Sequence, residues 1–164
     1  MHPDDIERTP AYRLIEEALT QLAPKELPFL PAVWDAFLAD PGPHRRGRSI
    51  GLVRFGEIVG DLGTWAPVVV SFLGGVLLNM MTDATAAGTT GLFRRIAARS
   101  RRRRAARQLQ AGALPDRQLT AAERADLVEQ ARTYAQAVGR TPADADRLVR
   151  VTVIVIDRLS RDPH

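Results

Sequence analysis

The sequence predicts an all-α protein in which amphipathic helices surround or flank one long apolar helix. Two observations give the class: apolar residues recur at spacings of three and four, and capping signals open several of these segments. A third sets the architecture, because residues 62–82 form twenty-one consecutive residues without a charge. The length of 164 residues fits one domain, or a small domain plus a membrane element.

Residues 1–43 are predicted to form an acidic unit of two helices. Thr9 and Pro10 are typical of a helix N-cap and first position, and Pro24 ends the helix that they open. A second short helix is predicted from Pro31 to the Asp-Pro-Gly-Pro turn at 40–43. The apolar faces of these helices carry Tyr12, Ile15, Leu19 and Leu22, then Val33, Trp34, Phe37 and Leu38.

Residues 44–61 are predicted to be a basic, glycine-rich linker. Its glycines weaken both a helix and a strand prediction. Gly56 and Gly60 have the spacing that lets two helices approach closely in a membrane, although a glycine-rich loop explains them equally well.

Residues 62–93 form the apolar segment. A helix of about 20 residues matches a hydrocarbon layer of roughly 30 Å, yet the central helix of a soluble bundle has the same composition. Three interpretations stay open: a permanent transmembrane helix, a bundle that inserts this helix on a trigger, and a permanently soluble bundle. Insertion would place in lipid the side chains of Trp65, Val68, Val69, Val70, Phe72, Leu73, Val76, Leu77 and Leu78, and Ser71, Gly74 and Gly75 would permit close helix packing.

Residues 94–112 are predicted to form an arginine-rich helix. Beside an apolar span, such a cluster is attracted to anionic lipid headgroups; alternatively it contacts nucleic-acid phosphates, or it is a solvated basic helix. No aromatic residue lies within 94–107, so the neighbouring apolar segment favours headgroups over nucleic acid. The arginines are Arg94, Arg95, Arg99, Arg101, Arg102, Arg103, Arg104 and Arg107.

Residues 113–164 are predicted to form a pair of amphipathic helices. Thr120 and Glu123 make a capping box, and Gly139 ends the first helix. Thr141 and Pro142 open the second helix, although its β-branched residues also fit a strand. The predicted buried faces are Leu127, Ala131, Tyr134, Ala135 and Val138, then Leu148, Val151, Val155 and Leu159.

The sequence contains no pattern that identifies a reaction, a cofactor or a metal site. Cysteine is absent, and the three histidines, His2, His44 and His164, lack metal-ligand spacing. No serine lies in a nucleophile-elbow motif, and no phosphate-binding glycine loop is present. Asp83 interrupts the uncharged stretch; we expect it to cap the helix or lie at the membrane surface, and the alternative is a polar pathway within an oligomer.

Charge is divided unevenly along the chain. Residues 1–43 carry a net −5 and residues 44–107 a net +9, whereas the remainder is balanced. We therefore expect a non-enzymatic membrane protein, either an anchored scaffold or an oligomerising, pore-forming effector with its C-terminal side in the cytosol. The alternative is a cytoplasmic all-α adaptor that binds a protein or nucleic acid through the arginine-rich helix. The use of arginine in place of lysine indicates a GC-rich, bacterial genome.

Overall fold

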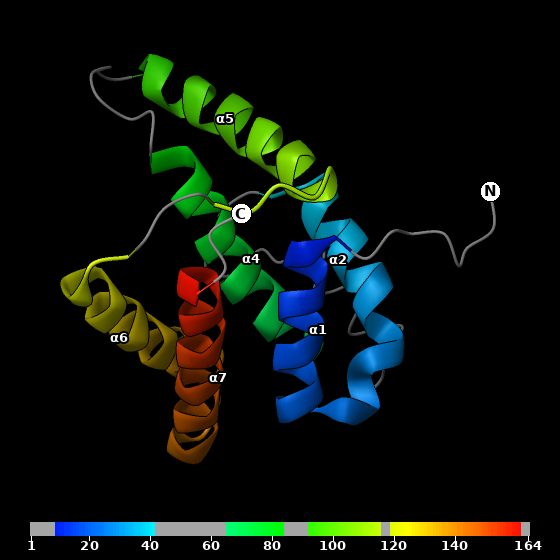
Figure 1. The fold of residues 1–164 in the computed structure, drawn as a ribbon, viewed down its shortest axis with the longest axis vertical. Helices are drawn as coiled ribbons and strands as arrows, with labels where there is room; N and C mark the ends of the chain where they lie inside the picture. The colour runs from blue at the N-terminus through cyan, green and yellow to red at the C-terminus, as the bar shows by residue number, and fades with distance from the viewer. Residues whose placement is uncertain (1–8, 42–64, 84–91, 116–118, 162–164) are drawn as a thin grey trace.

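The computed structural model describes residues 9–41, 65–83, 92–115 and 119–161, and these residues form helices without any strand (Figure 1). The predicted all-α class is therefore confirmed. The elements are α1 (Pro10–Leu22), the 3-10 helix η2 (Pro24–Phe29), α2 (Leu30–Ala39), α4 (Trp65–Asp83), α5 (Leu92–Gln110), α6 (Ala121–Ala137) and α7 (Pro142–Arg161).

Helices α1 and α2 follow the sequence signals closely. The Thr9 side chain accepts a hydrogen bond from the Tyr12 backbone N–H at 3.3 Å, as an N-cap does. The predicted apolar faces of both helices are buried, apart from the half-buried Leu38. The sequence did not predict η2, whose proline-rich stretch PKELPF makes one tight connection between the two helices.

Helices α6 and α7 form a hairpin that is closed by local chemistry. Thr120 and Glu123 make both hydrogen bonds of the predicted capping box, and Gly139 takes a φ of +79° in the turn. The segment from 142 is helical, so the alternative of a strand is wrong. One predicted core position is also wrong: Val138 is 41% exposed, because the helix ends at Ala137 and its face no longer points inward.

Helix α4 runs through the centre of the molecule and contacts helices from both halves of the chain (Figure 1). α1, η2 and α2 pack against it, α5 crosses it, and α6 approaches it from the remaining side. α6 packs mainly on α7, and α7 packs also on α1. One continuous cluster of buried apolar side chains joins all six α-helices, with α4 at its middle.

Helix α5 joins the bundle through small residues. Ala105, Ala106 and Leu109 are buried, whereas Arg103, Arg104 and Arg107 are exposed on the outer surface. Arg102 donates a hydrogen bond to the Pro41 carbonyl at 3.5 Å, near the end of α2. From residue 101 onward, where its side chains are described, the helix thus presents an apolar inner side of two alanines and a leucine and a basic outer side.

Candidate functional site

The apolar helix α4 is the most distinctive feature of the described structure. Within it, Trp65–Thr82 is long and apolar enough to cross a membrane, with a mean hydropathy of 1.6, and 72% of these residues are buried inside the protein. A core helix of a soluble protein meets the same two criteria. All nine predicted membrane-inserting side chains are buried: Trp65, Val68, Val69, Val70, Phe72, Leu73, Val76, Leu77 and Leu78.

One side of α4 is not enclosed, and that side is not apolar. Ser71, Gly75 and Thr82 are half-buried and Asn79 is exposed. Their spacings of four, four and three place them on one face of the helix. We call these four residues the open stripe. The most hydrophobic segment of the chain therefore shows solvent mainly its small and polar side chains.

Next to the open stripe, α4 is packed closely against α2. A Cβ atom built on Gly74 would lie 2.7 Å from two ring atoms of Phe37, which is closer than packed atoms approach. The Phe37 ring is itself buried and stacks on Trp34 with centroids 5.7 Å apart. Gly74 thus permits the close approach of α2 within this chain, and its role in packing between copies stays a prediction.

Polar groups from distant parts of the chain meet at the N-terminal end of α4. A Glu26 carboxylate oxygen in η2 accepts a hydrogen bond from the Ala66 backbone N–H at 2.7 Å. The first N–H groups of a helix have no partner within the helix, and a carboxylate there is also favoured by the helix dipole. Glu26 therefore holds the beginning of α4, although 40 residues separate it from Ala66 in the chain.

Two arginines lie close to the Trp65 ring at this same end. The Arg140 guanidinium carbon lies 4.6 Å from the ring centroid, and that of Arg147 lies 6.0 Å from it. Arg147 also donates a hydrogen bond to the Leu22 carbonyl at 2.7 Å and lies 3.7 Å from an Asp144 oxygen. Cation–π contacts of this kind attach the ring to the α6–α7 turn and to α7.

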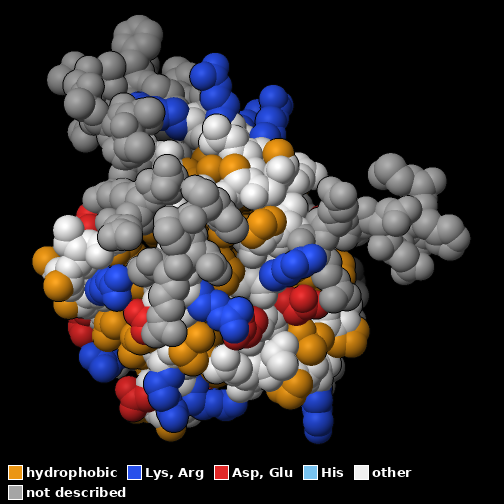
Figure 2. All heavy atoms as spheres, in the orientation of Figure 1, with side chains coloured by type: hydrophobic (Ala, Val, Ile, Leu, Met, Phe, Trp, Pro, Cys, Tyr) orange, Lys and Arg blue, Asp and Glu red, His pale blue; other side chains and the backbone are white. Residues whose placement is uncertain are grey.

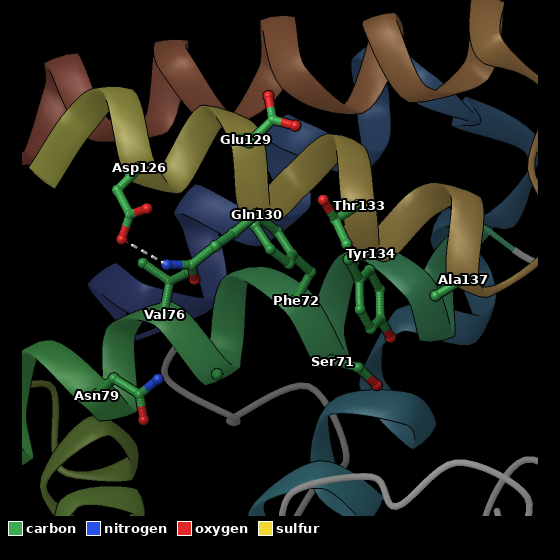
Figure 3. A pocket seen from close by; sticks show the side chains of 11 residues that line it. Ser71, Phe72, Val76, Asn79, Asp126, Glu129, Gln130, Thr133, Tyr134 and Ala137 are labelled. Carbon is green, nitrogen blue, oxygen red and sulfur yellow. Dashed lines mark hydrogen bonds between the residues drawn. The ribbon is translucent and has the colours of Figure 1, made fainter.

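A groove of about 440 Å³ lies between α4 and α6 (Figure 3). The Phe72 and Tyr134 rings lie along it with centroids 5.4 Å apart, and Gly75 opens it, since a Cβ there would meet nothing within 4 Å. At one end Asp126 accepts a hydrogen bond from Gln130 at 3.0 Å. The lining residues are Ser71, Phe72, Gly75, Val76, Asn79, Asp126, Glu129, Gln130, Thr133, Tyr134 and Ala137.

The Tyr134 phenol lies at the other end of this groove, beside Ser71 (Figure 3). Burial raises the pKa of Tyr134 above its usual value of 10.0, and a hydrogen bond from the Ser71 side chain opposes that rise. The phenol is thus neutral at physiological pH. It links α6 to the open stripe of α4 by a polar contact beside the Phe72 ring.

Within the part of the chain that the structure describes, the densest group of basic side chains lies on α5. Arg103, Arg104 and Arg107 are exposed, and Arg101 and Arg102 are half-buried. Blue side chains project from the end of the molecule formed by α5 in Figure 2, whereas both signs of charge alternate over the lower part. Ion pairs account for that alternation, including Arg124–Asp157 at 3.1 Å and Arg158–Glu17 at 2.8 Å.

Several predicted site residues fall outside what the structure describes. Gly56, Gly60, the whole 44–61 linker and the three histidines lie outside the described residues. The backbone of Asp83 ends α4, and those of Arg94, Arg95 and Arg99 belong to α5, but their side chains are not described. Among the described residues, no cluster of three His, Asp or Glu side chains could hold a metal ion.

Sequence reasoning missed Glu26, Arg140 and Arg147 as partners of α4. Each is an ordinary surface charge in the local pattern, and 125 residues separate Arg147 from Leu22, its hydrogen-bond acceptor. The available signal was the position of Trp65 at the start of an uncharged run, because an indole ring there needs a polar neighbour. No family of proteins, no curated protein and no solved structure matches the chain.

Proposed function

We propose that this protein is a non-enzymatic helical bundle that binds anionic membranes and transfers α4 from its interior into the lipid. The observation that carries the proposal is the enclosure of a membrane-length apolar helix by amphipathic helices, directly before a basic helix. Such an arrangement supports storage and release of the helix better than permanent insertion.

The described surface argues against a helix that lies permanently in lipid. Its exposed large hydrophobic side chains are Val138, Val153 and Ile154, which are too few for an apolar belt of membrane height. Helix α1 packs against α4 and carries Glu16 and Glu17 on its other side. A membrane around the intact bundle would enclose these carboxylates together with Arg158, the ion-pair partner of Glu17, and charged groups in lipid are costly.

Transfer of α4 into lipid is energetically accessible because its side chains exchange one apolar environment for another. The main cost is then the loss of close packing and the exposure of the apolar faces of the surrounding helices. An amphipathic helix such as α1 reduces that cost by lying in the headgroup region with its apolar face inward. Exposed arginines on α5 contribute about 1 kcal/mol each on an anionic surface.

Association between copies follows from the open stripe. Ser71 and Gly75 are small residues four positions apart, the spacing at which membrane helices approach closely. Asn79 on the same face has a hydrogen-bonding side chain that would avoid lipid by pairing with a second helix. We therefore propose a homo-oligomer in the inserted state, at the cytoplasmic membrane with the C-terminal helices on the cytosolic side.

Single cysteines test the transfer, since the chain has none of its own. Asn79→Cys and Ala125→Cys both replace exposed residues, on α4 and α6 respectively, so a charged maleimide should label both in solution. Vesicles of phosphatidylglycerol should slow the labelling of Asn79→Cys by roughly tenfold or more, because lipid then covers α4. Ala125→Cys should react as before, and equal labelling of both variants on vesicles would refute the proposal.

The burial of α4 supports a second candidate, a soluble adaptor whose α4 stays in the core while α5 binds a polyanion. In that case Asn79→Cys keeps its reactivity on vesicles, and a labelled duplex binds with an affinity that falls steeply with salt. Replacing Arg103, Arg104 and Arg107 by alanine should remove the binding. Fluorescence anisotropy at two salt concentrations measures both effects.

A further inference from the structure

The N-terminal end of α4 is fixed by side chains from three separate places in the fold. Glu26 comes from η2, Arg140 from the α6–α7 turn and Arg147 from α7, and they engage Ala66 and Trp65 of α4. We call Glu26, Trp65, Arg140 and Arg147 the clamp. The helix cannot leave the bundle by this end unless all three attachments break.

The chemistry of the clamp makes it responsive to lipid phosphate. A guanidinium over an aromatic ring is held by roughly 0.5–2 kcal/mol, whereas a phosphate accepts two parallel charge-assisted hydrogen bonds from the same group. Arg147 must in addition give up its hydrogen bond to the Leu22 carbonyl and its ion pair with Asp144, which a phosphate replaces with contacts of the same kind. Arg147 can be reached from outside, because its side chain is 43% exposed. A layer of anionic headgroups therefore competes directly for the arginines that hold Trp65.

The preference of an indole ring for the membrane surface also favours the release of Trp65. Indole rings accumulate at the boundary between headgroups and acyl chains, where the apolar body is in lipid and the N–H stays hydrated. Trp65 is 7% exposed in the bundle and stands at the first described residue of α4. Once the arginines turn to phosphate, the ring has a better position at the membrane surface than in the opened clamp.

We infer that the clamp is the anionic-lipid-sensitive release of α4, in which Arg140 and Arg147 exchange the Trp65 ring for lipid phosphates and the N-terminal end of α4 leaves first. This inference rests on the proposed function, since it names how membrane contact starts the transfer. Glu26 sets the remaining barrier, because the Ala66 N–H must give up a charged acceptor.

Quenching of Trp65 by brominated phosphatidylcholine measures the release. The chain has two tryptophans, so Trp34→Phe leaves Trp65 as the only indole and serves as the reference protein. In this background we compare three variants: the double variant Arg140→Ala/Arg147→Ala, the single variant Glu26→Gln and the single variant Arg158→Ala. Arg158→Ala is the matched control, because it breaks an α7–α1 ion pair of 2.8 Å that does not touch α4.

The clamp predicts a specific pattern across vesicles with and without phosphatidylglycerol. The reference should be quenched slowly on neutral vesicles and rapidly on anionic ones. The double arginine variant should be quenched roughly tenfold or more faster on neutral vesicles, with a smaller gain from anionic lipid. Glu26→Gln should be faster on both while keeping the gain, and Arg158→Ala should match the reference.

Three outcomes would overturn the inference. If the reference responds to anionic lipid but the clamp variants are no faster than it, α4 inserts by another route and the membrane proposal stands alone. If Arg158→Ala accelerates quenching as much as the clamp variants, general loosening of α7 explains the effect. If no protein is quenched on either vesicle, both the release and the membrane function fail. Thermal melts by circular dichroism establish that each variant is folded at the assay temperature.

Discussion

The two sides of α4 differ more than their sequence suggests. Gly74 and Gly75 are adjacent, yet the first lies under the Phe37 ring of α2 and the second opens onto an empty groove beside α6. The sealed side is built from α1, η2 and α2, and the open side carries Ser71 and Asn79. Hydrophobic length alone therefore does not describe this helix: its environment changes from one residue to the next.

The largest expected effect comes from placing a charge on each side. Val69 is fully buried, so Val69→Asp should lower the free energy of unfolding by more than about 4 kcal/mol. Asn79→Asp introduces the same carboxylate on the open stripe and should change stability by less than about 1 kcal/mol. Urea unfolding followed by circular dichroism measures both, and similar losses at the two sites would mean that α4 is not enclosed as described.

The adjacent glycines provide a comparison in which the expected changes in stability are smaller. Gly74→Ala should destabilise the protein by about 1–3 kcal/mol, because the added Cβ displaces the buried Phe37 ring. Gly75→Ala should stabilise it by up to about 1 kcal/mol, since alanine favours helix and meets no atom. Thermal melts of the two variants should shift in opposite directions. A shift in the same direction would show that helix propensity, not packing, decides both positions.

The smallest expected effect concerns the phenol that links the open stripe to α6. Tyr134→Phe removes the hydrogen bond with Ser71 and should cost about 1 kcal/mol or less at neutral pH. The raised pKa means that the folded protein holds the phenolic proton more tightly than the unfolded chain does. Stability should therefore fall as the pH rises above 10.0, the usual pKa of the group, and through its folded value.

Tyr134→Phe should remove this part of the alkaline loss. Urea unfolding of both proteins at neutral pH and at about pH 11 provides the comparison. An identical alkaline decline in the variant would mean that other groups titrate and that the Tyr134 phenol is not held in a low-dielectric wall.

Local signals were sufficient to predict most of the helices. Thr9, Thr120 and Gly139 each act through atoms within a few residues, so their effects can be read from the sequence. The apolar stripes of α1 and α7 were predicted for the same reason, since helical periodicity places them on one face. The prediction that Val138 is buried was wrong because this residue lies one position beyond the end of α6, where helical periodicity no longer applies.

The site could be predicted only in part, because its defining contacts join distant segments. The length of α4 and the basic character of α5 were visible in composition. The sequence did not predict which face of α4 is covered, because that depends on the position of Phe37 in α2 over Gly74. The attachments of Glu26, Arg140 and Arg147 to the end of α4 depend on the packing of three elements, and no local pattern encodes them.

The hydrogen bond from the Ala66 N–H to Glu26 has a consequence for the order in which the protein folds during synthesis. Three of the elements that pack against α4, namely α1, η2 and α2, precede it in the chain, and the ribosome therefore delivers them before the first valine of α4 emerges. The nascent apolar helix meets its cover and its N-terminal acceptor at once. Until α6 and α7 are translated, Phe72 and Trp65 lack the side chains of Tyr134 and Arg140 that lie against them in the folded protein. During that interval part of the apolar surface of α4 is accessible to factors that bind hydrophobic nascent segments.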